Sequence, residues 1–126
     1  MAIRESGEDY LETILLLHNK TGFVRSVDIA AELGYSKPSI SRAVGILKAD
    51  GYITVDKGGQ IILTDSGKAK AEQVYGRHVL LRGFLNEILG VSEENAEQDA
   101  CRIEHILSEE TYSKLKEFTE NFKKDQ

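Results

Sequence analysis

The feature that most constrains the fold is a pair of short amphipathic helices predicted on either side of Gly34. The range Ser26–Leu33 carries apolar residues at helical spacing, and its first serine is expected to cap it. Gly34 ends this helix in the left-handed conformation. Ser36 then caps a helix over residues 36–50, with Pro38 in the first turn, where a missing N–H costs no hydrogen bond. Two helices joined by a short glycine-containing turn predict a helix-turn-helix.

The second of these helices has a polar and basic N-terminal end, which is the end that enters the major groove in this motif. The β-rich segments 52–55 and 60–63 follow, and the residues between them, 56–59, predict a hairpin. A hairpin directly after a recognition helix is a wing, although Lys57 at its tip also suits a plain exposed turn. The residues expected to face DNA are Ser36, Lys37, Pro38, Ser39, Ser41 and Arg42, with Arg25 and Lys57 on phosphates.

Charge is unevenly distributed along the 126 residues. The net charge of −5 argues at first against a nucleic-acid partner. Residues 20–70, however, hold eight Lys/Arg and five Asp/Glu, whereas residues 1–19 and 71–126 are both net acidic. The middle third is therefore the predicted polyanion-binding surface, and the acidic remainder is suited to collecting cations.

A second group of functional side chains lies in a helix predicted to begin after Ser92. In the run 99–105, interpreted as the middle of that helix, Cys101, Glu104 and His105 are spaced so that they share one face. A thiolate, a carboxylate and an imidazole together form a donor set that a divalent transition metal accepts. The alternative is a small buried cysteine beside solvent-facing neighbours.

Two further helices carry isolated polar residues. A first helix over residues 6–19, with Ser6 as its expected cap, places Asp9 and Glu12 on one side, where ordinary first-turn acids would also stand. A long helix over residues 65–89 carries His78, and a lone histidine is usually structural. The second half of that helix is apolar on more than one face, which is typical either of a helix central to a core or of a subunit interface. After a serine cap at position 108, a last helix offers an apolar face.

The composition limits the class of protein. The length allows one large or two small domains, the single cysteine excludes an internal disulfide, and no apolar run is long enough to span a membrane. The N-terminus lacks an apolar signal core, so a cytoplasmic location is expected. We therefore expect a mainly α protein: an N-terminal winged helix-turn-helix with a two-stranded wing, then an all-helical domain.

Four separated motifs, in order, resemble the diphtheria-toxin-repressor family, and within it the short manganese-transport-regulator branch. The resemblance implies metal-dependent transcriptional repressors that lack the third, SH3-like domain of longer members. It implies a DNA-binding domain over residues 1–70 and a metal-binding and dimerisation domain over residues 71–126. The motifs are residues 8–12, 36–39, 76–78 and 100–108.

The resemblance also implies the ligands. Position 101 is glutamate in the manganese branch and cysteine in the iron branch, whereas the iron branch lacks the two carboxylates of the first helix. This chain is a hybrid, so Mn²⁺ and Fe²⁺ are the expected ions, with Zn²⁺ and Co²⁺ as alternatives. Arg82 stands where many members carry an acid, and Glu97 is a possible extra oxygen ligand. The implied ligands are Asp9, Glu12, His78, Cys101, Glu104 and His105.

The function implied is repression of metal-uptake genes by a homodimer on double-stranded operator DNA, with a metal bridging the two domains. No membrane and no small organic substrate are expected as partners. One alternative is a winged-helix regulator that needs no metal. A second is a small metallohydrolase using Glu104 or His105 as acid–base, but no nucleophile or oxyanion motif accompanies them, so no enzyme is expected.

Overall fold

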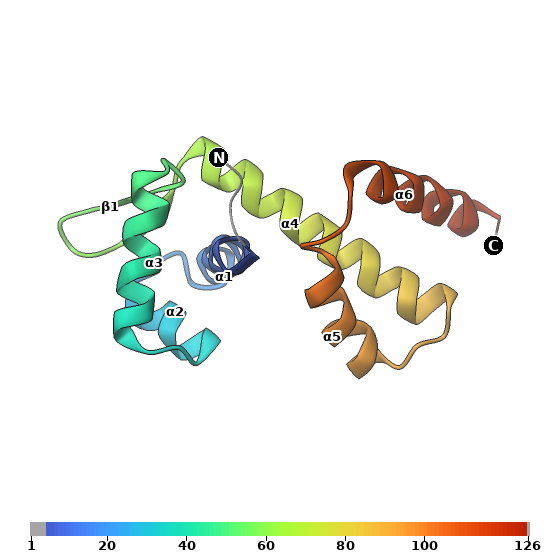
Figure 1. Ribbon diagram of the computed structural model, residues 1–126, viewed down its shortest axis with the longest axis horizontal. Coiled ribbons are helices and arrows are strands. Elements are labelled where there is room, and N and C mark those ends of the chain that lie inside the picture. Colours follow the sequence, from blue (N-terminus) through green and yellow to red (C-terminus); the bar gives the residue numbers. More distant parts are fainter. Residues whose placement is uncertain (1–4, 126) are drawn as a thin grey trace. The chain divides into compact units, whose positions relative to one another are not determined.

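The computed structural model describes residues 5–125, which form helices and one small sheet (Figure 1). The predicted fold class, a winged helix-turn-helix followed by helices, is confirmed. The chain divides into an N-terminal unit up to Gln73 and a C-terminal unit from Val74, and the predicted domain boundary at 70/71 remains a prediction. The elements are α1 (Glu5–Thr21), α2 (Ser26–Leu33), α3 (Lys37–Ala49), β1 (Ile53–Val55), β2 (Ile61–Leu63), α4 (Asp65–Gly83), the π-helical η1 (Phe84–Ile88), α5 (Glu93–Ile103) and α6 (Glu109–Lys124).

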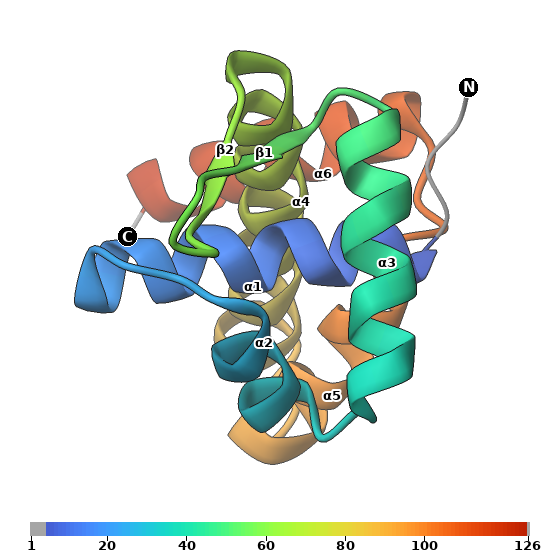
Figure 2. The same cartoon turned by 90° about the vertical axis from the view of Figure 1, so that its left-hand side faces the viewer.

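The core of the N-terminal unit is built from aliphatic side chains of α1, α2, α3 and the two strands. Figure 2 shows α3 running across α1, with α2 and the strands beside them. Burial of each such side chain contributes about 1.5–3 kcal/mol. This core fixes the recognition helix α3 against its support, which leaves the opposite face of α3 to solvent. The fully buried members are Leu11, Ile14, Ile29, Ile40, Leu47 and Ile53.

The helix-turn-helix begins and ends as local rules predict, with one correction. Gly34 has φ of +70°, and the Ser36 hydroxyl accepts the N–H of Ser39 at 3.3 Å. Ser26, in contrast, is not the cap of α2. Arg25 occupies the cap position, and its backbone N–H donates to the Asp28 carboxylate at 2.8 Å. The Asp28 carboxylate, at the third helical position, thus accepts a backbone N–H at the start of α2, where we had expected the Ser26 side chain to form the cap.

The start of α1 differs from the prediction as well. The helix begins at Glu5, so the predicted cap Ser6 lies inside it.

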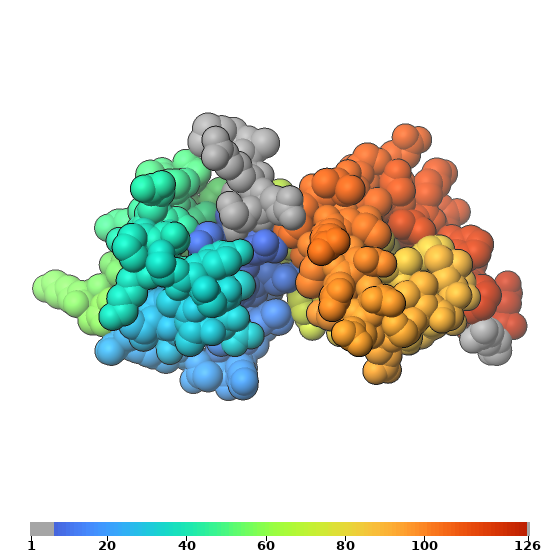
Figure 3. Space-filling view, turned by 60° about the horizontal axis from the view of Figure 1, so that its bottom comes forward, coloured from blue at the N-terminus to red at the C-terminus, as the bar shows by residue number. Residues whose placement is uncertain are grey.

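The wing is a two-stranded antiparallel sheet in which Ile53 pairs with Leu63 and Val55 with Ile61. Each strand is one residue shorter than predicted. In the turn, the Asp56 carboxylate accepts the N–H groups of residues 58 and 60, each at 2.9 Å. This side chain therefore closes the turn, which projects from the surface of the N-terminal unit (Figure 3).

The long helix expected over residues 65–89 is α-helical only to Gly83 and continues as a π-helical turn. The change is marked by the N–H of Leu89, which donates to the carbonyl of Phe84 at 3.1 Å, five residues back. Near its start, the Gly67 backbone approaches the Tyr52 carbonyl so closely that a Cβ would collide with it. No helix within residues 5–125 is long and apolar enough to cross a membrane.

The end of α5 corrects a further prediction. The run 99–105 is not the middle of a helix, because α5 ends at Ile103. Glu104 occupies the C-cap position with αR dihedral angles, and His105 follows in a turn. The side chain of His105 is therefore presented by a turn rather than by a helix face.

Candidate metal centre and DNA interface

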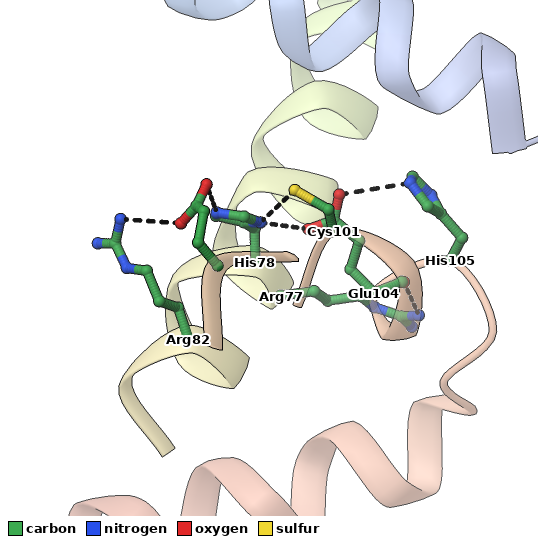
Figure 4. Close-up of polar contacts among 7 residues, drawn as sticks. Arg77, His78, Arg82, Cys101, Glu104 and His105 are labelled. Atoms are coloured by element: carbon green, nitrogen blue, oxygen red, sulfur yellow. Dashed lines mark hydrogen bonds and ion pairs between the residues drawn. The ribbon is translucent and has the colours of Figure 1, made fainter. Parts of the chain in front are cut away.

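His78 lies buried on α4 with a carboxylate at each ring nitrogen (Figure 4). Its Nδ1 is 2.9 Å from Glu104 Oε2, and its Nε2 is 3.0 Å from Glu97 Oε1. A neutral imidazole carries only one N–H, so it cannot donate to both carboxylates. The arrangement therefore favours a positive charge at this point, carried by a proton or by a metal ion.

Cys101 adds a thiol to the same cluster. Its Sγ lies 3.8 Å from His78 Nδ1. His78, Glu97 and Cys101 each offer a ligand atom within 4.8 Å of the other two. Soft sulfur donors combined with imidazole favour Fe²⁺, Co²⁺ or Zn²⁺, whereas a site made only of oxygen donors suits Mn²⁺. The donor chemistry of the C-terminal unit thus fits a divalent transition metal.

Glu104 is the most buried acid among the described residues of the C-terminal unit. Its side chain has no exposed surface, and its Oε1 is 3.3 Å from Nε2 of His105, whose side chain is 1% exposed. The carboxylate therefore lies between two imidazoles, those of His78 and His105. A buried carboxylate is costly unless positive charge and hydrogen bonds compensate it. Here Oε2 has His78 as its hydrogen-bond partner, whereas the buried Oε1 has none among the described residues, so this oxygen is open to a cation.

Glu97 is shared between two partners. One carboxylate oxygen contacts His78, and the other is 3.4 Å from Nη1 of Arg82. Both the Arg82 and Glu97 side chains are about half exposed, at 50% and 48%. Glu97, the expected extra oxygen ligand, thus lies within the cluster, where Arg82 partly neutralises its charge. Its role as a metal ligand remains a prediction.

The two acids of the first helix belong to the N-terminal unit. Asp9 and Glu12 are half-buried on α1, and their roles as ligands remain predictions. Tyr10, between them in sequence, is buried, with its ring centroid 5.9 Å from that of Tyr35. Burial raises the pKa of Tyr10, with further contributions from Tyr35 and from the Asp9 carboxylate. The phenol is therefore held neutral beside Asp9.

The predicted DNA-facing residues are exposed on the surface of the N-terminal unit. Within residues 5–125, Lys37, Arg42 and Lys57 form no ion pair with an acidic side chain, so their charges remain available to a polyanion. The Arg25 guanidinium lies 4.9 Å from the centroid of the Phe23 ring. Their contacts with bases or phosphates remain predictions. The other exposed members of the set are Ser36, Pro38, Ser39 and Ser41.

Arg77 is a residue that sequence reasoning did not select for the site. Its guanidinium donates to the backbone carbonyls of Glu104 and Leu107, directly beside the candidate ligands. The sequence signal was its place in the motif 76–78, directly before His78. The adjacency does not reveal which groups it contacts, because these two acceptors lie 27 and 30 residues later in the chain.

These observations define the class as a winged-helix protein whose helical second unit gathers metal-binding side chains. Residues 3–60 match the family model described as the iron dependent repressor N-terminal DNA binding domain. Residues 64–126 match the model described as the iron dependent repressor metal binding and dimerisation domain. The chain belongs to this family of metal-dependent transcriptional repressors, the diphtheria-toxin-repressor family, as the motifs predicted.

Two curated relatives cover nearly the whole chain. The HTH-type transcriptional regulator MntR of Geobacillus kaustophilus is 35% identical over 121 residues, which is 96% of this chain and 85% of the relative. An uncharacterized HTH-type transcriptional regulator of Methanocaldococcus jannaschii is 32% identical over 94% of this chain and 96% of its own length.

Solved structures show the same fold over part of their length. The manganese regulator SloR superposes with a TM-score of 0.81 at 27% identity, over 95% of this chain and 55% of that chain. IdeR of T. acidophilum gives a TM-score of 0.79 at 25% identity, over 94% of this chain and 55% of that chain. This chain thus spans about half the length of these solved chains.

Proposed function

We propose that this protein is a metal-dependent repressor of metal-uptake genes, which acts in the cytoplasm as a homodimer on operator DNA. One observation carries the proposal: His78, Cys101 and Glu104 converge in the same chain as a winged helix whose recognition helix exposes basic side chains. Membership of the metal-dependent repressor family and the names of the relatives support it.

Four side chains of the C-terminal unit would hold the ion, namely His78, Cys101, Glu104 and His105, and Asp9 and Glu12 of α1 would complete the set. A bound divalent ion supplies positive charge and fixed ligand directions. The Glu104 carboxylate supplies the buried negative charge that this ion would compensate. Mn²⁺ and Fe²⁺ are the first ions to test, and the Cys101 thiolate favours Fe²⁺, Co²⁺ or Zn²⁺ over Mn²⁺.

Ligands drawn from both units would give the site its regulatory role. In a dimer, two recognition helices bind half-sites about one helical turn of DNA apart. If Asp9 and Glu12 bind together with the C-terminal ligands, the metal-bound state restricts how the winged helices are spaced. Binding energy that is available only in the DNA-competent arrangement shifts the population toward it. We propose this bridging as the switch between free and operator-bound repressor.

The decisive experiment is fluorescence anisotropy with promoter DNA from a metal-uptake operon of the same genome. Mn²⁺, anaerobic Fe²⁺, Co²⁺ and Zn²⁺ are titrated, with a chelated sample, a Cys101→Ala variant and an exposed control, Ser113→Ala. We expect metal to strengthen DNA binding in the wild type and the control, and less in the cysteine variant. Equal binding with and without metal in all three proteins would overturn the metal-dependent function.

A second candidate is a winged-helix regulator that needs no metal. The observation that favours it is that Glu104 already contacts two imidazoles and Glu97 already contacts Arg82. These contacts compensate the acids of the cluster in part without an ion, since only Oε1 of Glu104 lacks a hydrogen-bond partner among the described atoms of these two carboxylates. The chelated sample separates the candidates, because only the second keeps full operator affinity there.

A further inference from the structure

We propose that Arg77 is a positioning residue for the metal centre, which holds the backbone of residues 104–107 and so fixes two candidate ligands. This inference rests on the proposed function, because it concerns the ligands Glu104 and His105. It assigns a role in metal affinity to a side chain that carries no ligand atom of its own.

The first step of the argument is the contact of Arg77 with the chain that follows α5. Its Nη1 donates to the Leu107 carbonyl at 2.7 Å and to the Glu104 carbonyl at 3.4 Å. The two carbonyls flank His105, so one guanidinium spans the turn that presents this histidine. The last carbonyls of a helix have no partner within it and carry partial negative charge, which a cation compensates. Arg77 therefore stabilises the point at which α5 ends.

The second step is that the guanidinium is itself held in place. Its Nη2 is 3.0 Å from Glu109 Oε2, and its Cζ lies 5.3 Å from the centroid of the Tyr112 ring. Both partners belong to the first turns of α6. The Arg77 side chain is only 14% exposed, so solvent competes little for its hydrogen bonds. Because α6 holds the guanidinium in place, Arg77 can restrain the turn of residues 104–107 to which it donates.

The third step is that consecutive residues of α4 hold Glu104 at two places. His78 contacts the Glu104 carboxylate at 2.9 Å, and Arg77 contacts its backbone carbonyl. Backbone and side chain of one ligand are thereby restrained together. The planar guanidinium fork serves several acceptors at once, which a lysine ammonium cannot do in the same geometry. Groups that orient metal ligands typically change metal affinity by about 10–100-fold.

The experiment compares the wild type with Arg77→Lys and Arg77→Met, using Co²⁺ alone as the probe. Affinity is measured by competition with a chromogenic chelator, and the Co²⁺ absorption spectrum, including its thiolate charge-transfer band, reports ligand geometry. We expect Arg77→Lys to remain folded by circular dichroism, to bind Co²⁺ about tenfold more weakly or worse, and to show an altered spectrum. The matched control, Glu110→Gln, removes an exposed charge on the first turn of α6 that does not contact Arg77, and should stay within about twofold of the wild type.

The outcomes separate this inference from the function on which it rests. A wild type that binds no Co²⁺ overturns both. A wild type that binds Co²⁺ through its thiolate, with a folded Arg77→Lys of equal affinity and identical spectrum, overturns the positioning role alone. Loss of folding in both Arg77 variants would assign the residue to the stability of the C-terminal unit and would also overturn it. A weakened affinity with an altered spectrum in a folded variant supports it.

Discussion

The His78 ring and the Glu104 carboxylate form a buried contact of 2.9 Å between residues 26 positions apart in the chain. It joins α4 to the end of α5, and neither side chain is more than 7% exposed. At this depth, removal of His78 takes from the Glu104 carboxylate its only hydrogen-bond partner among the described residues and leaves it the 3.3 Å contact with His105, whereas an exposed pair would lose little. The contact is therefore both a structural tie and the starting point for metal binding.

The first prediction separates the two carboxylates that contact this ring. We expect His78→Ala to lower the free energy of unfolding of the metal-free protein by about 3 kcal/mol, because it leaves buried Glu104 short of a partner. Glu97→Gln, at the half-exposed partner of the other ring nitrogen, should cost less than about 1 kcal/mol. Urea denaturation in chelator measures both. Equal losses in the two variants would contradict the difference in burial.

Metal should stabilise the folded chain. At a free concentration about a hundredfold above the dissociation constant, an ion that binds only the folded state adds about 2.7 kcal/mol. We therefore expect Co²⁺ or Zn²⁺ to raise the thermal midpoint of the wild type and chelator to reverse the effect. Cys101→Ala should show a smaller rise at the same concentration. A midpoint unchanged by each ion would count against the site.

DNA affinity should depend on the cations at the start of α3. Lys37→Ala and Arg42→Ala should each weaken binding and reduce the slope of log affinity against log salt by about 0.9 for each phosphate that the protein no longer neutralises. Lys48, an exposed lysine near the other end of the same helix, provides the matched control. If Lys48→Ala had the same effect as the other two, general electrostatic attraction would replace groove entry by the N-terminal end of α3.

The start of α4 should tolerate no side chain at Gly67. A Cβ there would collide with the Tyr52 backbone carbonyl, so Gly67→Ala should lower the free energy of unfolding by about 1–3 kcal/mol through overpacking. At Gly45 in α3, by contrast, an added Cβ would meet no heavy atom within 4 Å. Gly45→Ala should therefore stabilise the protein by up to about 1 kcal/mol. Urea denaturation of both variants tests the contrast.

Stability at alkaline pH should depend on Tyr10. Its pKa is raised in the folded state, mainly by burial, so the folded chain holds this proton more tightly than the unfolded chain does. The resulting stability is complete below the unfolded pKa of about 10 and is lost as pH rises through the folded pKa. Tyr10→Phe should therefore lose less stability than the wild type above about pH 10. Tyr75→Phe, at a more exposed tyrosine, serves as control, and matching alkaline profiles for all three proteins would refute the prediction.

Local chemistry predicted most of the N-terminal unit because its signals act over a few residues. Ser36 and Gly34 were placed correctly since a cap and a left-handed glycine need only their own neighbours. Ser26 was placed wrongly because Arg25 occupies the cap position, where its N–H donates to the Asp28 carboxylate. Which of two neighbouring residues caps a helix is decided here by a single hydrogen bond, and residue spacing alone does not reveal that bond.

The candidate site was predictable in its residues but not in its geometry. Helical spacing brought Cys101 and Glu104 into consideration, yet α5 ends at Ile103, next to a turn held by Arg77 from 27 residues earlier. The division of Glu97 between His78 and Arg82 likewise depends on how α4 and α5 pack. Periodicity within one helix carries no information on contacts between helices.

The exposed position of Cys101 gives the chain a built-in chemical reporter. It is the sole cysteine in the sequence, so every thiol-directed reagent is directed to one atom of the candidate site and nowhere else. The rate of alkylation by a small maleimide therefore follows the occupancy of that atom in real time, without a spectroscopically active ion. Ions without useful visible absorption bands, such as Mn²⁺ and Zn²⁺, can then be compared on a single kinetic scale.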